Sequence, residues 1–557
     1  MKVSTKQWNS IDWRKIRTYV ANLQEELVVA YKNNDLGEVY TLQQRLMMSY
    51  EGRVTAVRKV ISNKGRKTEG PDGNTWKTSS ERIQAIADIR DILLKKSGSY
   101  IAGPVRRVWI PKSKPGEFRP LGIPNMIDRA LQALVLLVLD PIVEDFSESS
   151  SYGFRKFRSA NDAIQRIRTI LDKPNAPRYV WDADISKCFD KISHEFLEKE
   201  IQGLLCSKGC EFVGKWLKAP IMDKGCMSYP KEGTPQGGVL SPLLCNICLN
   251  GLENAVRDGL PSSSSTAGRK LKGKWVVRYA DDFIITNLDN DKELIKRDIP
   301  HVVEFLSERG LEISEKKSRI IDLYSESFDF LGWTIKQHRR NVFINKRNKN
   351  SLILVIEPTN SSVKRLKTRL KEEFRSHKPI KALIKDVNPI LRGWANYYRS
   401  SYHSQVFFQS IGHYVYLSWW KWAQKKHPNR NKQWIYSRYI VKTEKRSWRI
   451  GTSDEIFLYD ITQAKQLIVT NLKNNLNPYT EEEYFVNRTI IRDADKFRKA
   501  IYKKYNSRCF VCNGPLYGDE DVHLHHLIAR KDGGQYTLAN IVPVHSICHD
   551  SITYARK

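Results

Sequence analysis

The chain has 557 residues, which at roughly 100–200 residues per domain allows several folded units and excludes a single small binding module. Its 41% hydrophobic and 28% charged residues are typical of a protein with sizeable cores and exclude a disordered chain. Lys and Arg number 93 against 61 Asp and Glu, a net charge of +32, which predicts a polyanionic partner such as nucleic acid or an acidic membrane surface.

Two features argue against the membrane. The most apolar run, Ala130–Leu139, is about half the length that a bilayer requires. The N-terminus lacks the apolar stretch of a signal peptide, so we expect a reducing compartment. Nine cysteines, an odd number, suit a metal site better than a disulfide framework.

In chain order, residues 1–50 carry apolar groups at helical period and predict a helical extension, followed by a basic, glycine-bearing loop at 62–75. From 100 to about 330, short apolar runs alternate with helical segments, which indicates a mixed α/β domain. After Gly332 we expect a mostly helical, very basic region, then a connecting region at 450–500 and a compact Cys/His module at 501–557.

The positive charge is concentrated in residues 331–450, which hold 27 Lys and Arg against 5 Asp and Glu, a net of +22. This stretch is also rich in aromatic residues. Their helical spacing, as at Trp394, Tyr397 and Tyr398, favours a core role, but planar side chains can also stack on unpaired bases. Few Asp and Glu residues balance the Lys and Arg residues, so we interpret the region as a nucleic-acid-binding surface.

Acidic residues interrupt two strands that are expected to be buried. Asp184 ends the apolar run that begins at Tyr179, and Asp281 and Asp282 lie within Trp275–Ile285. Buried carboxylates cost several kcal/mol each unless cations compensate, and two Mg²⁺ ions about 4 Å apart would do so in a nucleotidyl transferase. A lone Asp-Asp pair, by contrast, is more often part of a β-turn.

The wider sequence favours the catalytic interpretation. Tyr279-Ala280-Asp281-Asp282, with an upstream strand ending in Asp184, resembles the palm of a reverse transcriptase. Further blocks follow the order of that family: Arg107–Lys112, Arg119–Pro124, Ser151–Arg155, Gly233–Pro242 and Phe330–Gly332.

The resemblance implies residue roles. Asp184 and Asp281 would bind both Mg²⁺ ions, with Asp282 as a supporting carboxylate. Lys112 and Arg119 would grip the incoming triphosphate. The remaining nucleotide-site residues would be Phe189, a steric gate against the ribose 2′-hydroxyl, Gln236, and Lys317 near the primer.

Flanking segments narrow the resemblance. Asn388–Arg399 resembles the maturase segment, domain X, of group II intron-encoded proteins, and the N-terminal block with Ala56-Val57-Arg58 and the Gly70–Gly73 loop resembles bacterial members. This implies that the basic aromatic region binds intron RNA and the template–primer duplex. The expected RNA-binding residues are Arg392, Trp394, Tyr397, Tyr398 and Arg399.

The C-terminal module contains Cys509-x2-Cys512 and His545-x2-Cys548, a spacing that can hold one Zn²⁺ in a unit too small to fold without a staple. A structural zinc knuckle alone would explain these four residues. With His525, His526, Gly533-Gly534 and Asn540, however, the module resembles an HNH nuclease of the ββα-metal type.

By that resemblance His526 is the general base, His525 and His549 hold a catalytic divalent ion, and Asn540 orients the base. Cysteine is more usual than histidine at position 545. His545 is therefore either the fourth zinc ligand or a ligand of the catalytic ion.

We thus expect a multidomain α+β protein with right-hand polymerase fingers and palm, a helical thumb, a DNA-binding region and a small zinc-stapled nuclease. The expected boundaries are 1–75 for the extension and loop, 76–335 for fingers and palm, 336–445 for the thumb, 446–497 for the DNA-binding region and 498–557 for the nuclease.

The expected function is that of a group II intron-encoded reverse transcriptase, maturase and HNH endonuclease. It would assist splicing of its host intron RNA, nick target DNA and copy the RNA from the nicked end with dNTPs. Alternatives are a splicing-only maturase and a free-standing reverse transcriptase. We expect the protein in the cytoplasm or nucleoid of a bacterium, or in an organelle matrix, and not secreted; its oligomeric state is not predicted.

Overall fold

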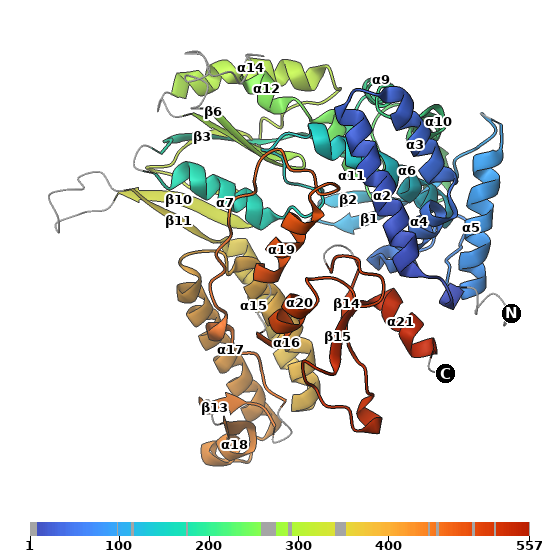
Figure 1. Cartoon of the computed structure of the whole chain (residues 1–557). Helices are drawn as coiled ribbons and strands as arrows, with labels where there is room; N and C mark the ends of the chain where they lie inside the picture. Colours follow the sequence, from blue (N-terminus) through green and yellow to red (C-terminus); the bar gives the residue numbers. More distant parts are fainter. Residues whose placement is uncertain are drawn as a thin grey trace. The chain divides into compact units, whose positions relative to one another are not determined.

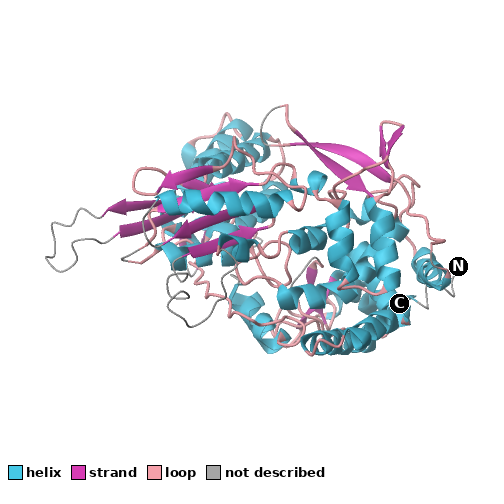
Figure 2. Cartoon of the chain, turned by 90° about the horizontal axis from the view of Figure 1, so that it is seen from above, coloured by secondary structure: helices cyan, strands magenta, loops and turns pink. Residues whose placement is uncertain are grey.

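The computed structural model describes residues 8–96, 98–112, 116–173, 176–257, 274–287, 292–339, 352–443, 446–452, 456–492, 496–516 and 520–555. The chain forms two compact units. The first comprises residues 1–159, 181–319 and 472–557, and the second comprises residues 160–180 and 320–471. Helices and strands are mixed along the chain (Figure 2), as expected for a multidomain α/β protein.

The first unit begins with a group of N-terminal helices that pack on a long buried helix, α6 (Figure 1). Their starts are fixed by side-chain caps, for example Asp12, which accepts hydrogen bonds from the backbone N–H groups of Arg14 and Lys15. These helices are α2 (Trp13–Lys32), α3 (Leu36–Met48), α4 (Tyr50–Ser62), the 3₁₀ turn η1 (Lys64–Lys67), α5 (Ser79–Leu94) and α6 (Met126–Phe146).

The apolar run Ala130–Leu139 forms the middle of α6, where Leu131, Leu134 and Leu139 are fully buried. Among the residues that the structure describes, no helix combines the length and apolar character needed to cross a membrane.

The rest of the expected fingers and palm contains two four-stranded sheets. One has the order β2-β1-β4-β5 and the other the order β6-β7-β3-β8. Their strands are β1 (Val105–Pro111), β2 (Phe118–Ile123), β3 (Tyr179–Asp184), β4 (Ile221–Asp223), β5 (Cys226–Ser228), β6 (Lys274–Tyr279), β7 (Asp282–Asn287) and β8 (Arg319–Asp322); the accompanying helices are α8 (Cys188–Lys191), α9 (His194–Gln202), α10 (Ser207–Leu217), α11 (Ser241–Cys248), α12 (Leu252–Val256) and α14 (Lys292–Ser307).

The C-terminal part of the first unit contains a ββα arrangement, as the HNH resemblance implies. Two helices precede it. The elements are α19 (Glu482–Arg492), α20 (Lys496–Lys504), β14 (Val522–His526), the 3₁₀ turn η3 (Arg530–Asp532), β15 (Ile541–His545) and α21 (Ser546–Ala555). Strands β14 and β15 are antiparallel, and their register pairs Val522 with His545 and His526 with Ile541.

The second unit is mainly helical, but it also contains a three-stranded sheet that the sequence did not lead us to expect. Its order is β11-β10-β9. The elements are α7 (Ala160–Leu171), β9 (Phe328–Phe330), β10 (Trp333–Arg339), β11 (Leu352–Pro358), α15 (Asn360–Arg375), α16 (Ile380–Tyr398), α17 (Ser404–Lys426), α18 (Lys432–Tyr439), β12 (Ile440–Thr443), β13 (Arg446–Ile450) and the 3₁₀ turn η2 (Ile461–Gln463).

The compact units cut across the expected domain order, because residues 160–180 lie with residues 320–471. The amide of Gln337 donates to the Leu171 carbonyl at 3.1 Å, and Arg168 donates to the Ser400 carbonyl at 3.2 Å. Both contacts join segments more than 160 residues apart, which sequence periodicity does not reveal.

Candidate functional site

The Tyr279–Asp282 turn joins β6 and β7 and places Asp281 and Asp282 at one end of the hairpin. Ala280 has φ 58°, in the left-handed region, which is uncommon for a residue with a side chain. The buried Arg278 supports this conformation by donating to the Ala280 carbonyl at 3.3 Å and to Asn246 Oδ1 at 3.2 Å. Sequence reasoning missed Arg278 and Asn246, because their roles depend on this contact.

The Ser151–Arg155 segment packs against the same turn, and this contact explains why position 153 is glycine. Its backbone runs beside β6, where the Tyr152 amide donates to the Arg278 carbonyl at 2.9 Å. A Cβ atom on Gly153 would lie 2.3 Å from the Ala280 nitrogen, closer than any real contact. Glycine is therefore required at 153, since the two backbones approach each other directly.

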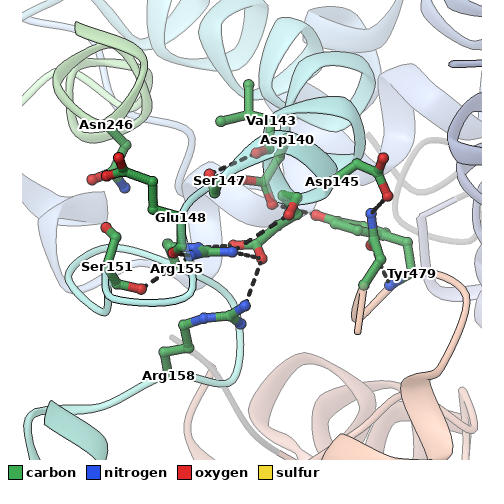
Figure 3. Close-up of polar contacts among 12 residues, drawn as sticks. Asp140, Val143, Asp145, Ser147, Glu148, Ser151, Arg155, Arg158, Asn246 and Tyr479 are labelled. Atoms are coloured by element: carbon green, nitrogen blue, oxygen red, sulfur yellow. Dashed lines mark hydrogen bonds and ion pairs between the residues drawn. The ribbon is translucent and has the colours of Figure 1, made fainter. Parts of the chain in front are cut away.

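Arg155 of this block has a structural partner. Its guanidinium pairs with Glu144 of α6 at 2.9 and 2.8 Å, and Arg158 adds a third ionic contact at 3.4 Å. Figure 3 shows Arg155 and Arg158 converging at the end of α6. Burial alone would raise the pKa of Glu144, but the two arginines hold it below its ordinary value.

The catalytic carboxylates predicted from the sequence lie together. Asp184 ends β3, which neighbours β7 in the sheet, and Asp282 begins β7. Burial and the charges of Asp281, Asp184 and Asp182 raise the pKa of Asp282 to about 7. Burial and Asp184 also raise the pKa of Asp281. Such crowded negative charge is relieved by divalent cations.

Asp182 is a fourth carboxylate that the sequence analysis did not select. It precedes Asp184 by two residues, so both project from the same face of β3. That alternation was the signal available in the sequence.

Lys317 lies directly at Asp184. Its ammonium is 2.9 and 3.0 Å from the two carboxylate oxygens of Asp184. The segment around Lys317 is held beside β3, because the Ser314 amide donates to the Asp184 carbonyl and Ser318 Oγ accepts from the Asp184 amide. Lys317 is thus in contact with the carboxylate cluster itself.

The other expected nucleotide-site residues surround this cluster on separate elements. Phe189 is half-buried in α8, with its ring centroid 6.2 Å from that of Phe154. Gln236 donates to Asp190 at 3.3 Å. Lys112 and Arg119 are exposed; the positive charge of Lys112 lowers the pKa of Asp190 and that of Arg119 lowers the pKa of Asp281, each against a larger effect of burial.

In the C-terminal module, the Sγ atoms of Cys509, Cys512 and Cys548 and a ring nitrogen of His545 lie within 4.8 Å of one another, and all four residues are buried. This donor set fits a tetrahedral Zn²⁺ with bonds of about 2.3 Å to sulfur. His545 Nδ1 is 3.4 Å from Cys512 Sγ, and Nε2 is 3.0 Å from the Pro515 carbonyl oxygen. A carbonyl only accepts, so Nε2 carries a proton, and Nδ1 is the nitrogen that would bind the metal.

The expected nuclease residues lie on β14 and α21. The rings of His525 and His549 have centroids 4.9 Å apart. His523, which the sequence analysis did not select, has its ring centroid 5.2 Å from that of His549. Strand alternation puts His523 on the same side as His525, and His526 on the other.

His526 and Asn540 are linked through the loop that follows His526. Arg530 donates to His526 Nε2 at 3.3 Å, which requires that nitrogen to be unprotonated. The Asn540 side chain accepts from the Ile528 amide at 2.7 Å and donates to the carbonyls of Ile528 and Gln535. Asn540 therefore holds the loop that follows His526 through hydrogen bonds to the backbone of Ile528 and Gln535.

The expected RNA-binding residues divide by exposure. Arg392 and Tyr397 are exposed and Trp394 is half-buried, whereas Tyr398 and Arg399 are buried. The Tyr398 ring packs 4.6 Å from that of Trp333, and its hydroxyl lies 2.6 Å from Ser362 Oγ. Tyr398 and Arg399 thus belong to the core of the second unit and present no surface to RNA, which corrects that expectation.

Comparisons with known families cover most of the chain. The family model for reverse transcriptase (RNA-dependent DNA polymerase) matches residues 110–335, and that for the N-terminal domain of reverse transcriptase matches 8–89. The group II intron, maturase-specific domain matches 363–440, and the HNH endonuclease family matches 509–554.

Several known proteins are similar to the chain in sequence. Protein YkfC of Escherichia coli K12 is 33% identical, over 53% of this chain and 83% of its own length. The group II intron-encoded protein LtrA of Lactococcus lactis subsp. cremoris is 26% identical, over 91% of this chain and 93% of its length. The putative COX1/OXI3 intron 1 protein of Saccharomyces cerevisiae is 25% identical, over 91% of this chain and 65% of its length.

Proposed function

The chain belongs to the group II intron-encoded proteins, and on that premise we propose which of its residues carry the family's activities. It combines an RNA-directed DNA polymerase, a maturase and an HNH DNA endonuclease, with intron RNA and DNA as substrates. The RNA would be that of its own host intron, in a bacterium or an organelle, with the bacterial cytoplasm or nucleoid or the organelle matrix as its location.

In the polymerase, Asp184 and Asp281 would hold two Mg²⁺ ions, with Asp282 supporting them. These ions would activate the attacking 3′-hydroxyl and stabilise the leaving pyrophosphate. Lys112 and Arg119 would bind the triphosphate of the dNTP, because their charges already act on carboxylates of the site. Phe189 would exclude a 2′-hydroxyl, and Gln236 would line the nucleotide site.

Lys317 would keep Asp184 in place. Its two contacts of 2.9 and 3.0 Å hold the carboxylate from the side of the Ser314–Ser318 segment. Lys317 would also lie near the primer.

In the nuclease, His526 would accept a proton from water, and His525 and His549 would bind a divalent ion, with His523 as a further candidate ligand. Asn540 would position His526 through the backbone. Cys509, Cys512, His545 and Cys548 would hold a structural Zn²⁺. Intron RNA would meet the exposed Arg392 and Tyr397, together with Trp394, while DNA would be delivered to the nuclease by the rest of the particle.

We propose the expected domain boundaries for these roles: extension and loop 1–75, fingers and palm 76–335, thumb 336–445, DNA-binding region 446–497 and nuclease 498–557.

The observation that carries this assignment is the convergence of Asp184, Asp281 and Asp282 at the turn, where burial and mutual repulsion raise the pKa of Asp282 to about 7. Asp281→Ala should abolish cDNA synthesis in primer extension on an RNA template and leave intron RNA binding within a few fold. Asp91→Ala is the control, since Asp91 pairs with its exposed neighbour Arg90. Loss of RNA binding together with synthesis would contradict the assignment.

A further inference from the structure

The N-terminal extension reaches the Cys/His cluster through one arginine of α4. Arg58 Nη2 lies 3.3 Å from Cys548 Sγ, 3.9 Å from Cys512 Sγ and 3.4 Å from His545 Nδ1. These residues are separated from Arg58 by 454 to 490 positions along the chain. Arg58 therefore touches three members of the cluster without being able to bind a metal itself, because guanidinium only donates.

The guanidinium is fixed from its other sides. Glu520 accepts from Nε at 2.9 Å and from Nη2 at 2.8 Å, a two-point contact that sets the plane of the group. The Trp13 ring of α2 lies 4.6 Å from the guanidinium carbon. The Arg58 side chain is 11% exposed, so the cation is held in a closed position beside the sulfurs.

Charge explains why a cation belongs there. Three thiolates and a neutral imidazole around Zn²⁺ leave one net negative charge, and all four donor residues are buried. A buried net charge costs several kcal/mol unless an opposite charge or hydrogen-bond donors compensate. Arg58 directs hydrogen-bond donors at the sulfurs, and its positive charge is shared between the cluster and the Glu520 carboxylate. Groups in this outer position also tune metal affinity.

We propose that Arg58 is the outer cation of the zinc centre, and that it couples zinc binding by the nuclease module to docking of that module on the N-terminal helices. The proposal rests on the zinc assignment made above. It gives a role to the Ala56-Val57-Arg58 segment, which the polymerase and nuclease chemistry leaves without one.

Other contacts place the module on the same helices. Arg14 of α2 donates to the Phe510 carbonyl at 3.4 Å. Glu482 forms ion pairs with Arg17 of α2 at 2.6 Å and with Arg508 of the module at 2.9 Å. The segment just before α19 packs on α6. Asn477 of this segment donates to the Pro141 carbonyl at 3.0 Å. The Tyr479 hydroxyl donates to Asp140 (Figure 3).

Because coupling between two binding events is reciprocal, zinc should tighten docking by the same factor by which docking tightens zinc. Loss of zinc should therefore loosen the docking of the nuclease module on the N-terminal helices.

Zinc retention of the full chain tests the first half of this inference. Arg58→Met keeps length and apolar character and removes the charge. Arg53→Met is the matched control, because Arg53 lies on the same helix, is as buried as Arg58 when whole residues are compared (9% exposed each), and donates to the Ser49 and Ile86 carbonyls. Zinc content is measured by mass spectrometry, and zinc release by competition with a colorimetric chelator.

We expect one zinc per wild-type chain, and about 10- to 100-fold weaker retention in Arg58→Met than in Arg53→Met. Equal retention in the two variants would overturn the role of Arg58. A wild-type chain that binds no zinc would instead overturn the zinc assignment itself. Should Arg58→Met fail to fold, Arg58→Lys with Co²⁺ in place of zinc gives the same decision, through a shift of the sulfur-to-cobalt absorption bands relative to the wild type.

Hydrogen exchange tests the coupling. Chelation of zinc from the wild-type chain should raise exchange in α4 around Arg58 as well as in the module. In Arg58→Met, exchange in α4 should already be raised and should no longer respond to zinc. Exchange in α4 that is indifferent to zinc in the wild type would contradict the coupling.

Discussion

The polymerase site and the nuclease module both place their functional residues on an antiparallel hairpin, yet the two hairpins are held by different means. The β6–β7 hairpin belongs to a four-stranded sheet and is locked by buried partners, Arg278 and the backbone of Gly153. The β14–β15 hairpin is a two-stranded sheet in a module of about 60 residues, whose cluster of sulfurs and imidazole takes the place of a large core.

The β6–β7 hairpin is held by buried packing, whereas the β14–β15 hairpin would be held by the metal that we propose for its cluster. Changes in the metal cluster should therefore act mainly on the nuclease, and through Arg58 on the docking of its module. Changes in the buried supports of the palm should act on the polymerase or on the whole first unit.

Cys512→Ser should remove zinc binding and DNA nicking altogether, because structural zinc sites contribute about 10 kcal/mol or more of folding free energy in small modules. Primer extension on RNA should persist. Nicking of a labelled target duplex and cDNA synthesis are measured on the same preparation. Cys226→Ser is the control, since Cys226 is exposed in β5. Loss of both activities would show that the two hairpins share their stability.

Arg155→Met should lower the free energy of unfolding by about 3–5 kcal/mol, since it leaves the buried Glu144 carboxylate without its two-point partner. Denaturant unfolding measures the loss, and Arg90→Met, from an exposed pair, should cost at most about 1 kcal/mol.

The same pair predicts a pH dependence. The pKa of Glu144 is lowered in the folded protein, so its contribution is present above the unfolded pKa of about 4.3 and is lost as the pH falls through the folded value. The stability difference between Arg155→Met and wild type should therefore narrow as the pH falls below about 4. A difference that stays constant down to pH 3 would contradict the ion-pair interpretation.

Gly153→Ala should slow cDNA synthesis by about 100-fold, because its Cβ atom would lie 2.3 Å from the Ala280 nitrogen and displace the carboxylate turn by an ångström or more. Nicking should be unchanged. Gly37→Ala is the control, since its Cβ would meet only Asp35 Oδ1, at 3.5 Å. Unchanged synthesis in Gly153→Ala would show that the turn is not held by this close approach.

Phe189→Ala should reduce discrimination between dNTPs and rNTPs by up to about 100-fold, with a smaller effect on dNTP incorporation itself. Single-nucleotide extension with each substrate measures the ratio. Its neighbour Phe154, whose ring contacts that of Phe189, provides the comparison variant Phe154→Ala. Equal discrimination in wild type and Phe189→Ala would remove Phe189 from the steric role.

The polymerase, maturase and metal-site assignments could be predicted from the sequence because each depends on short, local residue patterns. The order of the motif blocks indicated the polymerase and the maturase, and the matched families agree with that order. Two-residue spacings indicated the metal module, since Cys-x2-Cys and His-x2-Cys bring donors together within one turn. The excess of Lys and Arg within residues 331–450 predicted a nucleic-acid-binding region, because net charge is also a property of the local sequence.

Features that depend on contacts between residues far apart in the sequence became visible only in the tertiary structure. Only folding shows that Arg399 is buried, that His545 turns Nδ1 and not Nε2 toward the sulfurs, and that Asn540 bonds to the backbone of the loop after His526. It also places Arg58 against a cluster more than 450 residues away. Side-chain burial and long-range hydrogen bonds are properties of the packed chain, so no periodicity or spacing in the sequence could have specified them.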